Sequence, residues 1–353
     1  MKNLTITGWG KCIPQPVVTN DDLATVIDTN DEWITSRSGI RERHVSHVNN
    51  SDMATLAGKR ALAAAGVQPT DIDFVIVATC TPDRQIPSSA AYVQSKIGAV
   101  RAAATDINAG CTGFIYGLSM AHGLIATGTA NRILLIGSER ITSYLNLAKR
   151  DSAVLFGDGA GAVVVETSDD DSGIKSMALG ADGDRAEYLT STGLGTEFMD
   201  SESEIAIVLD GAEIFKGAVV KMSDGTVSAA KDAGWELEDI DLVIPHQANL
   251  RIIDAVRRRI KADESKMYVN IHKYGNTSAA TIPIALSEAV DEGRVGPGSK
   301  LVFTAYGAGV TWGSVAFQWG ERTRPIATID EELPEPDRTG LELIVNRQKA
   351  FNK

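Results

Sequence analysis

The apolar residues of this chain fall in short uninterrupted runs, such as residues 133–136, 162–165 and 301–303. Runs of this kind are typical of strands that are buried on both faces, as in sheets covered by helices. Between the runs lie segments rich in Ala, Leu and Ile, such as residues 112–125, whose composition favours helices. Strands and helices in alternation predict a layered α/β protein.

Two parts of the chain repeat each other, in the same order. Residues 65–76 read AGVQPTDIDFVI and residues 233–244 read AGWELEDIDLVI, so each predicts a helix ended by glycine, a short loop and a buried strand. Further along, GCTG at 110–113 and GNTS at 275–278 each lead into an apolar helix that is followed by an apolar strand. Chance similarity between two ordinary βα units is the alternative, but two repeats in register favour a duplication.

A duplication predicts two halves related by a pseudo-twofold axis, over residues 1–170 and 171–320. Their buried strands should lie side by side. Residues 184–210 are polar and irregular, which predicts a loop insertion in the second half. Residues 321–353 are charged and contain proline before a predicted short helix over 341–351, so we treat them as a C-terminal extension without an assigned role.

Charge and composition narrow the class of protein. The net charge of −12 and the pI near 5.0 argue against nucleic acid as a partner, because phosphates would be repelled. The N-terminus lacks a basic segment followed by an apolar one, and no apolar run is long enough to span a membrane. Three cysteines, Cys12, Cys80 and Cys111, are too few for a disulfide framework, so we expect a cytoplasmic location and a free thiol.

Cys111 is the strongest candidate nucleophile. It opens the predicted helix over residues 112–125, where the helix dipole and the free backbone N–H groups favour a thiolate. Its small neighbours Ala109, Gly110 and Gly113 allow another backbone or a ligand to approach closely. The alternative is that Cys111 packs as a small buried apolar residue.

His246 and Asn276 are expected to lie near Cys111. His246 follows a buried strand, at the edge where α/β sheets commonly bind ligands, although a single histidine is often structural. In the repeat, Asn276 occupies the place that Cys111 has in the first half. The pseudo-symmetry therefore predicts that Cys111, His246 and Asn276 meet at the interface between the halves.

Other chemistries fit the sequence less well. Cysteine proteases use a similar set of residues, but they differ around the cysteine and often contain disulfides. The five histidines are scattered and no Cys or His pair has ligand spacing, so we expect no metal ion and no cofactor. GDGAG at 157–161 looks like a dinucleotide-binding loop, yet it leads into a predicted strand where such a loop leads into a helix.

Three segments resemble the catalytic segments of the β-ketoacyl-acyl-carrier-protein (ACP) synthase III family, a group of thiolase-superfamily condensing enzymes. They are GCTGF at 110–114, HQANLR at 246–251 and YGNTSAA at 274–280. NDEWITSRSGIRER at 30–43, LFGDGAG at 155–161 and GAGVTWG at 307–313 also match, so the resemblance covers about residues 1–320. It implies a thiolase-like, five-layered αβαβα fold. Type III polyketide synthases and hydroxymethylglutaryl-CoA synthases share Cys–His–Asn, but not this set of flanking segments.

The resemblance implies a decarboxylative Claisen condensation that initiates fatty acid synthesis. Cys111 would accept the acyl group of an acyl-CoA, with the backbone N–H groups of Cys111 and Ala308 as the oxyanion hole. His246 and Asn276 would donate hydrogen bonds to the thioester carbonyl of malonyl-ACP. A specialised condensing enzyme or acyltransferase of secondary metabolism, with the same three residues, is the alternative. A non-catalytic acyl-CoA-binding subunit is a third reading, and it predicts a degraded catalytic set.

The resemblance also implies two binding surfaces. The CoA-binding residues would be Trp33, Arg37, Arg150, Phe215 and Asn249. A basic cluster follows His246, and its alternative reading is a solvated helix face. By the resemblance this cluster meets the acidic carrier protein, through Arg251, Arg258, Arg259 and the separate Lys216.

Three features depart from the best-known members of the family. These members are homodimers in which a phenylalanine reaches from the partner subunit into the acyl pocket; the corresponding residue here is Ile86. The smaller side chain predicts a longer or reshaped pocket, and hence a medium-chain or branched primer. Tyr306 replaces a usual phenylalanine, with an effect that the sequence does not assign. The extension after residue 320 exceeds the usual length.

Overall fold

The strands form two principal sheets. The computed structural model describes residues 3–168, 170–198 and 203–351. The five-stranded sheet contains, in spatial order, β1 (Asn3–Cys12), β7 (Gly159–Ser168), β6 (Arg132–Glu139), β4 (Phe74–Ala78) and β5 (Ala103–Ile107). The four-stranded sheet contains β11 (Leu242–Pro245), β12 (Lys300–Gly307), β13 (Thr311–Gln318) and β8 (Gly173–Ala181). Two small sheets pair β2 (Val17–Thr19) with β3 (Glu42–His44), and β9 (Leu189–Thr192) with β10 (Ala206–Leu209).

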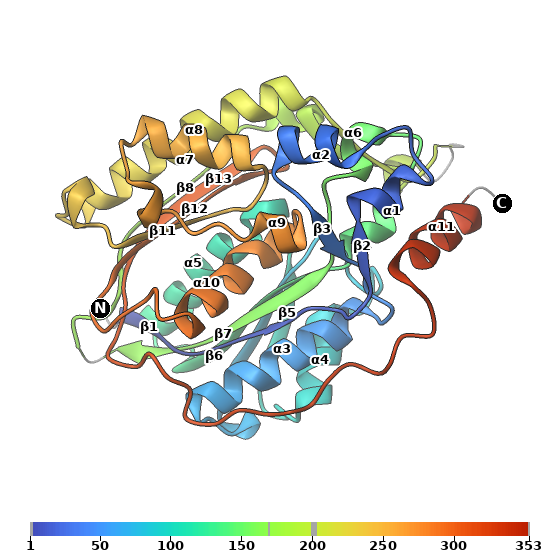
Figure 1. Ribbon diagram of the computed structural model, residues 1–353. Helices are drawn as coiled ribbons and strands as arrows, with labels where there is room; N and C mark the ends of the chain where they lie inside the picture. Colours follow the sequence, from blue (N-terminus) through green and yellow to red (C-terminus); the bar gives the residue numbers. More distant parts are fainter. Residues whose placement is uncertain (1–2, 169, 199–202, 352–353) are drawn as a thin grey trace.

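The helices form three layers around these two sheets (Figure 1). The outer face of the five-stranded sheet is covered by α3 (Asn50–Ala65) and α4 (Ser89–Ile97). Between the sheets lie α5 (Gly113–Ala126) and α10 (Thr281–Asp291), and α7 (Gly211–Asp232) and α8 (Leu250–Arg259) cover the four-stranded sheet. The remaining helices are α1 (Asn20–Ala24), α2 (Asp31–Ser38), α6 (Arg150–Ala153), α9 (Ile271–Tyr274) and α11 (Gly340–Phe351). This five-layered αβαβα arrangement confirms the predicted fold.

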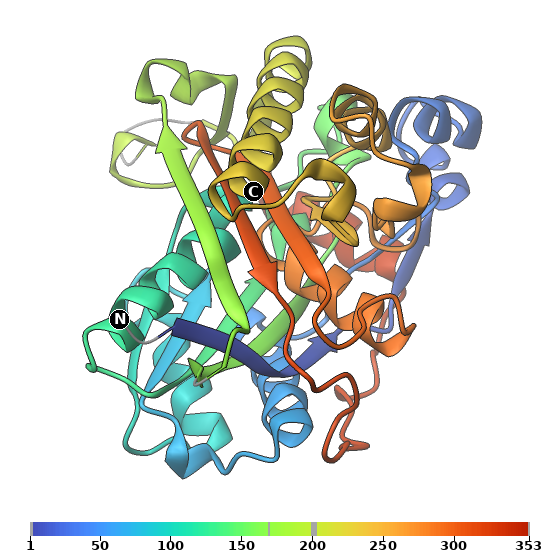
Figure 2. The ribbon, with the colours of Figure 1, turned by 90° about the vertical axis from the view of Figure 1, so that its left-hand side faces the viewer.

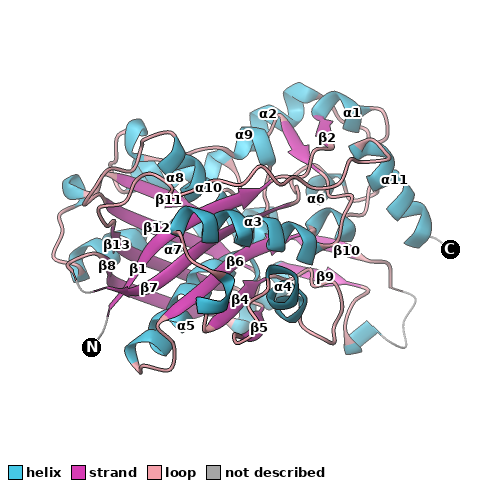
Figure 3. Ribbon diagram, turned by 90° about the horizontal axis from the view of Figure 1, so that it is seen from below, coloured by secondary structure: helices cyan, strands magenta, loops and turns pink. Residues whose placement is uncertain are grey.

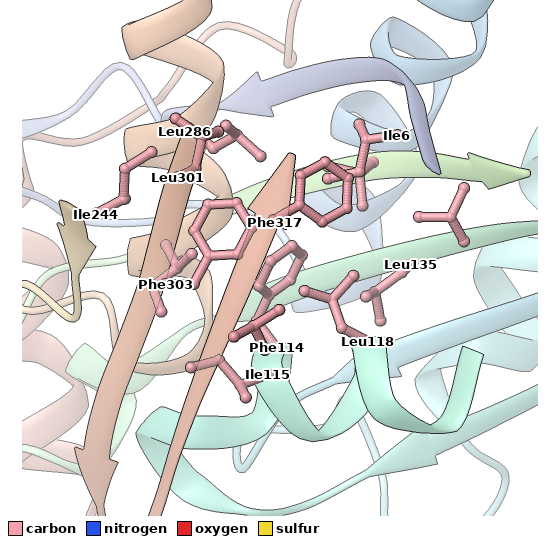
Figure 4. Close-up of a cluster of buried hydrophobic side chains, with 14 of the residues drawn as sticks. Ile6, Phe114, Ile115, Leu118, Leu135, Ile244, Leu286, Leu301, Phe303 and Phe317 are labelled. Carbon is pink, nitrogen blue, oxygen red and sulfur yellow. The ribbon is translucent and has the colours of Figure 1, made fainter. Parts of the chain in front are cut away.

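The uninterrupted apolar runs belong to strands with helices on both faces. In β6, Ile133 and Leu135 face the central helices, whereas Leu134 and Ile136 face α3 and α4. Side chains of α5 fill the space between the sheets, where Phe114 lies close to Phe317 (Figure 4). Because successive strand residues point to opposite faces, a strand buried on both sides must be apolar at every position.

The two sheets repeat one topology. The order β1-β7-β6-β4 matches β8-β13-β12-β11, with two antiparallel pairings followed by one parallel pairing in each. Figure 2 shows β8 (green) beside the orange-red strands of the second sheet. The first sequence repeat corresponds to the ends of α3 and α7, where Gly66 and Gly234 have positive φ values of 67° and 73°. The pseudo-twofold relation is therefore confirmed, and β5 is an addition at the edge of the first sheet.

Two segments outside the repeat have definite structure. Residues 184–210, predicted as an irregular loop, include the β9–β10 pair, so this prediction is wrong for those strands; residues 199–202 lie outside the described part. The predicted helix of the C-terminal extension is α11, which lies beside α1 and β2 (Figure 3). Among the described residues, no helix is long and apolar enough to cross a bilayer.

Candidate active site

Cys111 lies where the two halves pack closely against each other. It is the central residue of a 3₁₀ turn (Gly110–Thr112) that leads into α5, and it is 7% exposed. A Cβ atom on Gly307 of β12 would lie 2.8 Å from the Cys111 nitrogen, so a larger residue would push the strand away. Gly110, with φ of 51°, packs in the same way against Ala308. The glycines thus bring the backbone N–H groups of Cys111 and Ala308 to the sulfur atom.

The thiol of Cys111 is protonated in the resting site. Burial raises the pKa of the Cys111 thiol to about 11, although the Ser278 hydroxyl and the backbone N–H groups of Cys111 and Ala308 lower it. The prediction of a resting thiolate is therefore wrong. The helix start supplies hydrogen-bond donors as expected, but loss of hydration has the larger effect on the thiolate.

His246 follows β11 and is held by α10. Its side chain is 1% exposed, and its Nδ1 atom lies 2.6 Å from the hydroxyl oxygen of Thr281. Burial lowers the pKa of His246 to about 3, so the imidazole is neutral at physiological pH and has one N–H group. The Thr281 hydroxyl also lies 3.0 Å from the Ser278 carbonyl oxygen, and its single proton goes to only one of these two acceptors. The choice decides which nitrogen of His246 is protonated.

Asn276 has a fixed amide orientation. Its Oδ1 atom accepts a hydrogen bond from the Ser278 backbone N–H at 2.8 Å. Its own backbone N–H donates to the Leu155 carbonyl at 2.9 Å. Because Oδ1 is occupied, the amide nitrogen of Asn276 is the group available as a donor toward the cavity.

Sequence analysis missed the buried carboxylate that links these segments. Glu139, at the end of β6, has no exposed surface and accepts hydrogen bonds from Ser278 Oγ at 3.0 Å and from the Cys80 backbone N–H at 3.1 Å. Burial raises the pKa of Glu139. The signal was a glutamate at the end of an otherwise apolar strand, since a buried carboxyl group needs several donors. Ser278 and Thr281 were missed because their side chains act through contacts far away in sequence.

Two cavities meet at Cys111. The outer cavity, of about 330 Å³, is lined by Cys111, His246 and Asn276 together with several predicted CoA-binding residues. A second cavity, of about 300 Å³, also has Cys111 in its lining, and we call it the inner cavity. Its lining includes Cys80, Ile141, Tyr144, Phe156, Leu189 and Ile207. A thiol shared by two cavities is placed to receive an acyl group from a thioester in one cavity while the acyl chain lies in the other.

The rim of the outer cavity is built around Trp33. The guanidinium carbons of Arg37 and Arg150 lie 4.8 Å and 4.4 Å from the centre of its ring. The Asn249 amide donates to the Arg37 carbonyl at 3.0 Å and accepts from the Arg251 backbone N–H at 2.8 Å. Asn249 therefore joins α2 to α8, and its predicted contact with CoA stays a prediction.

The remaining residues singled out from the sequence differ in where they lie. Phe215 and Tyr306 line the outer cavity, and the Tyr306 hydroxyl packs against Gly217 of α7. Ile86 is 86% exposed and lines neither cavity. Two predicted carrier-binding residues are engaged in ion pairs, namely Lys216 with Glu213 at 2.6 Å and Arg259 with Asp224 at 3.0 Å. Over the described ranges, Arg251 and Arg258 form no ion pair.

Within residues 3–168, 170–198 and 203–351, no group of three or more His, Cys, Asp or Glu side chains is placed to hold a metal ion.

Comparisons with known proteins agree with this fold. The family described as 3-oxoacyl-(acyl-carrier-protein) synthase III matches residues 105–183, and its C-terminal domain matches residues 230–319. A relative from Vibrio vulnificus strain YJ016, β-ketoacyl-(acyl-carrier-protein) synthase III 2, is 48% identical over 342 residues, which cover 96% of this chain and 94% of the relative. The crystal structure of 3-oxoacyl-(acyl-carrier-protein) synthase III from Aquifex aeolicus VF5 has a TM-score of 0.85 and 42% identity, and covers 90% of this chain and 100% of that chain. A priming β-ketosynthase of a polyketide biosynthetic pathway has a TM-score of 0.86 and 32% identity, covering 91% of this chain and 97% of that chain.

The matches differ in how much of this chain they include. The whole Aquifex chain aligns with 90% of this chain, so the part of this chain that does not align is about as long as residues 321–353. The Vibrio match covers 96% of the chain and so leaves fewer than half of those residues outside. Some relatives therefore share much of the C-terminal extension.

Fold and comparisons together define a condensing enzyme with the thiolase fold, an acyltransferase. Within this class, the chain belongs to the β-ketoacyl-acyl-carrier-protein synthase III family. The family predicted from the sequence is confirmed.

Proposed function

We propose that this enzyme condenses an acyl-CoA primer with malonyl-ACP through an acyl-Cys111 intermediate, in the initiating step of fatty acid synthesis. One observation carries the proposal: Cys111, His246 and Asn276 line a single cavity at the junction of the halves, and Cys111 also lines a second cavity. Membership of the family supports the reaction class.

In the first half-reaction, the sulfur of Cys111 attacks the carbonyl carbon of the acyl-CoA. A new C–S bond forms, the bond to CoA breaks, and the proton of the Cys111 thiol leaves with the CoA thiol. The backbone N–H groups of Cys111 and Ala308 hold the carbonyl oxygen as it becomes negative. The acyl chain then occupies the inner cavity, past Ile141 and Tyr144.

In the second half-reaction, malonyl-ACP enters the outer cavity. The Asn276 amide and His246 Nε2–H donate to its thioester carbonyl, CO₂ leaves, and the electron pair of the broken C–C bond forms an enolate. The enolate carbon attacks the acyl group, and Cys111 leaves as a thiolate that regains a proton. This role requires the proton of His246 to be on Nε2. A Thr281 hydroxyl that donates to Nδ1 fixes that tautomer.

The surface around the outer cavity supports the proposed partner. Arg251 and Arg258 are the cations on α8 that form no ion pair among the described residues, so they are available to an acidic carrier protein. Lys216 and Arg259 would exchange their present partners for carboxylates of the carrier. The net charge of −12 would repel an acidic carrier elsewhere.

A homodimer and a primer longer than acetyl, or branched, belong to the same proposal. β5 is the last strand of its sheet, so its free edge is available to a second copy. Ile86 is 86% exposed, which suits a residue that enters the partner subunit. The inner cavity of about 300 Å³ offers room for several carbons beyond acetyl.

We propose further that residues 1–170 supply the nucleophile and residues 171–320 the two hydrogen-bond donors. The strands of the five-stranded sheet lie between Asn3 and Ser168, and those of the four-stranded sheet between Gly173 and Gln318. All three cysteines are free, which supports a cytoplasmic location.

Intact-mass spectrometry after incubation with acyl-CoAs from acetyl to decanoyl tests the proposal. We expect one acyl adduct in the wild type, none in Cys111→Ala, and an unchanged adduct in Cys80→Ala. Cys80 is the matched control because it lines the same inner cavity. No adduct with any primer, or an adduct that persists in Cys111→Ala, would refute the covalent role. Best loading with acetyl-CoA would refute the proposed primer.

The second candidate is a condensing enzyme of secondary metabolism with the same three residues. The 32% identity to a priming β-ketosynthase over 91% of this chain favours it. Acyl-Cys111 would form in both cases, so the two functions are distinguished by the acceptor that gives product. Product formed with the malonyl-ACP of primary fatty acid synthesis supports the first function. Product only from another carrier or acceptor supports the second.

A further inference from the structure

The C-terminal extension is attached along the first half of the molecule. In Figure 1 it passes below α3 and ends in α11, beside β2. Its backbone pairs with the end of α3, since the Ile326 N–H donates to the Ala64 carbonyl at 2.9 Å. Lys59 of α3 forms an ion pair with Glu331 at 2.7 Å, and Leu333 is buried among the side chains of α3. These contacts fix the path of the extension before α11 begins.

Helix α11 begins with a capping box and buries its apolar side. The Thr339 N–H donates to the Glu342 carboxylate at 2.8 Å, and the Glu342 N–H donates back to Thr339 Oγ1. Leu343 and Ile344 are 6% and 3% exposed, and they belong to one cluster with Ile34 of α2, Ala153 of α6 and the next residue, Val154. The helix therefore shares one apolar cluster with both elements that carry the Trp33 rim.

Two polar side chains of α11 hold the backbone between β6 and β7. Arg347 donates from Nη1 to Thr142 Oγ1 at 2.7 Å, and it lies 4.0 Å from the buried Asp158 carboxylate. The Gln348 Oε1 atom accepts from the Leu147 backbone N–H at 2.8 Å. Helix α11 thus holds residues 141–154 at Thr142 and Leu147, and the apolar cluster that it shares with Ala153 continues to the end of this segment.

The held segment lines both cavities. Its 3₁₀ turn (Ile141–Tyr144) lines the inner cavity, and α6 carries Arg150, which stacks on Trp33 at the rim of the outer cavity. The turn and α6 are four residues each, too short to be stable without external contacts. The position of Arg150 therefore depends on what packs behind it.

We propose that α11 is a brace that positions the CoA-binding rim, with Arg347 and Gln348 as its positioning residues. They act on CoA through Leu147, Arg150 and Trp33, and they touch neither CoA nor Cys111. The inference rests on the proposed function, in which Trp33 and Arg150 hold the nucleotide of CoA. It gives the extension a task in substrate affinity.

The test compares Arg347→Ala and Gln348→Ala with Asn346→Ala, which changes an exposed residue of the same helix. Calorimetry gives the Kd for free CoA, and kinetics compare an acyl-CoA with the corresponding acyl-N-acetylcysteamine thioester, which lacks the nucleotide. We expect the Kd for CoA and the KM for acyl-CoA to rise about fivefold to tenfold in the two test variants. The kcat/KM for the short thioester should stay within about twofold of wild type, because that substrate does not reach Trp33.

The outcomes separate the inference from the proposed function. An equal loss with both substrates, or an unchanged Kd for CoA in both variants, would show that α11 serves only stability and would overturn the inference. Gln348→Ala removes a single hydrogen bond, so it decides the matter if Arg347→Ala does not fold. A wild type that binds no CoA and forms no acyl adduct would refute the proposed function, and the inference with it.

Discussion

Replacing the Asn276 amide by a carboxylate should abolish condensation and spare acyl transfer to Cys111. The Asn276→Asp side chain has nearly the same shape, and its first oxygen can still accept from the Ser278 N–H, now at 2.8 Å from Oδ1. The second oxygen then takes the place of the amide nitrogen. A hydrogen-bond donor becomes a negatively charged acceptor, at the position where the enolate oxygen develops.

The size of the effect follows from charge and distance. Two unit charges 4 Å apart repel by about 4 kcal/mol at an effective dielectric constant of 20. That barrier corresponds to roughly a 10³-fold loss of rate, and loss of the donor itself typically costs about 10²–10³. We therefore expect condensation by Asn276→Asp to fall by at least about 10³. Residual activity should increase at lower pH, since a protonated carboxyl group regains a donor.

Measuring the two half-reactions separately provides the control. Intact mass reports acyl-Cys111, and release of CO₂ from malonyl-ACP reports the second half-reaction. Loading within about twofold of wild type would show that the mutant site is folded and that Asn276 acts after acylation. Equal losses in both half-reactions, or condensation within tenfold of wild type, would refute the assigned role.

Three further predictions concern the residues around Asn276 and the carrier surface. The Thr281→Val variant should have a condensation rate about tenfold lower than wild type, and Thr281→Ser should retain the wild-type rate. In the valine variant, ¹⁵N NMR should show a smaller fraction of His246 in the Nε2–H tautomer. Burial lowers the pKa of His246 from 6.5 to about 3, so the folded protein loses stability as the pH falls below 6.5. Between pH 6 and 4, the free energy of unfolding measured in urea should fall by about 1.4 kcal/mol per pH unit more for the wild type than for His246→Gln. The same pH dependence in both proteins would contradict this prediction. Arg258→Glu should raise the KM for malonyl-ACP at low salt and leave that for acyl-CoA unchanged; a change in both would argue against a carrier surface.

The fold could be predicted because two pairs of repeated segments in the sequence reveal its pseudo-twofold symmetry. The repeated segments mark equivalent helix ends, and the uninterrupted apolar runs mark strands buried on both faces. The same symmetry placed Asn276 opposite Cys111, and both residues line the outer cavity. Glu139 and Ser278 could not be paired in this way, because they do not occupy equivalent positions in the two repeats. The pattern of the extension predicted a helix, but α11 derives its importance from contacts with Thr142 and Leu147 that no local pattern reveals.

The protonated state of the Cys111 thiol, which the sequence did not predict, has a physical cause that applies to the whole site. A helix start lowers the pKa of a thiol when water or a cation also supports the charge, whereas Cys111 is 7% exposed and its thiol has a raised pKa of about 11. The donors around Cys111 are backbone N–H groups, which serve a carbonyl oxygen as well as a sulfur atom. They are therefore suited to the bound thioester more than to the free enzyme.

In the proposed mechanism, the second half-reaction requires a neutral His246. An imidazolium whose pKa is about 3 would be a strong acid and would transfer its proton to the enolate, which would end the reaction before a C–C bond forms. Neutral imidazole is a far weaker acid, so it donates a hydrogen bond and keeps its proton. The burial that lowers the pKa of His246 also raises that of Cys111, and both shifts come from the dry junction between the halves. In the proposed mechanism, the site thus keeps the carbanion reactive at the expense of a resting thiolate, and acylation would depend on the oxyanion donors that the thioester meets as it binds.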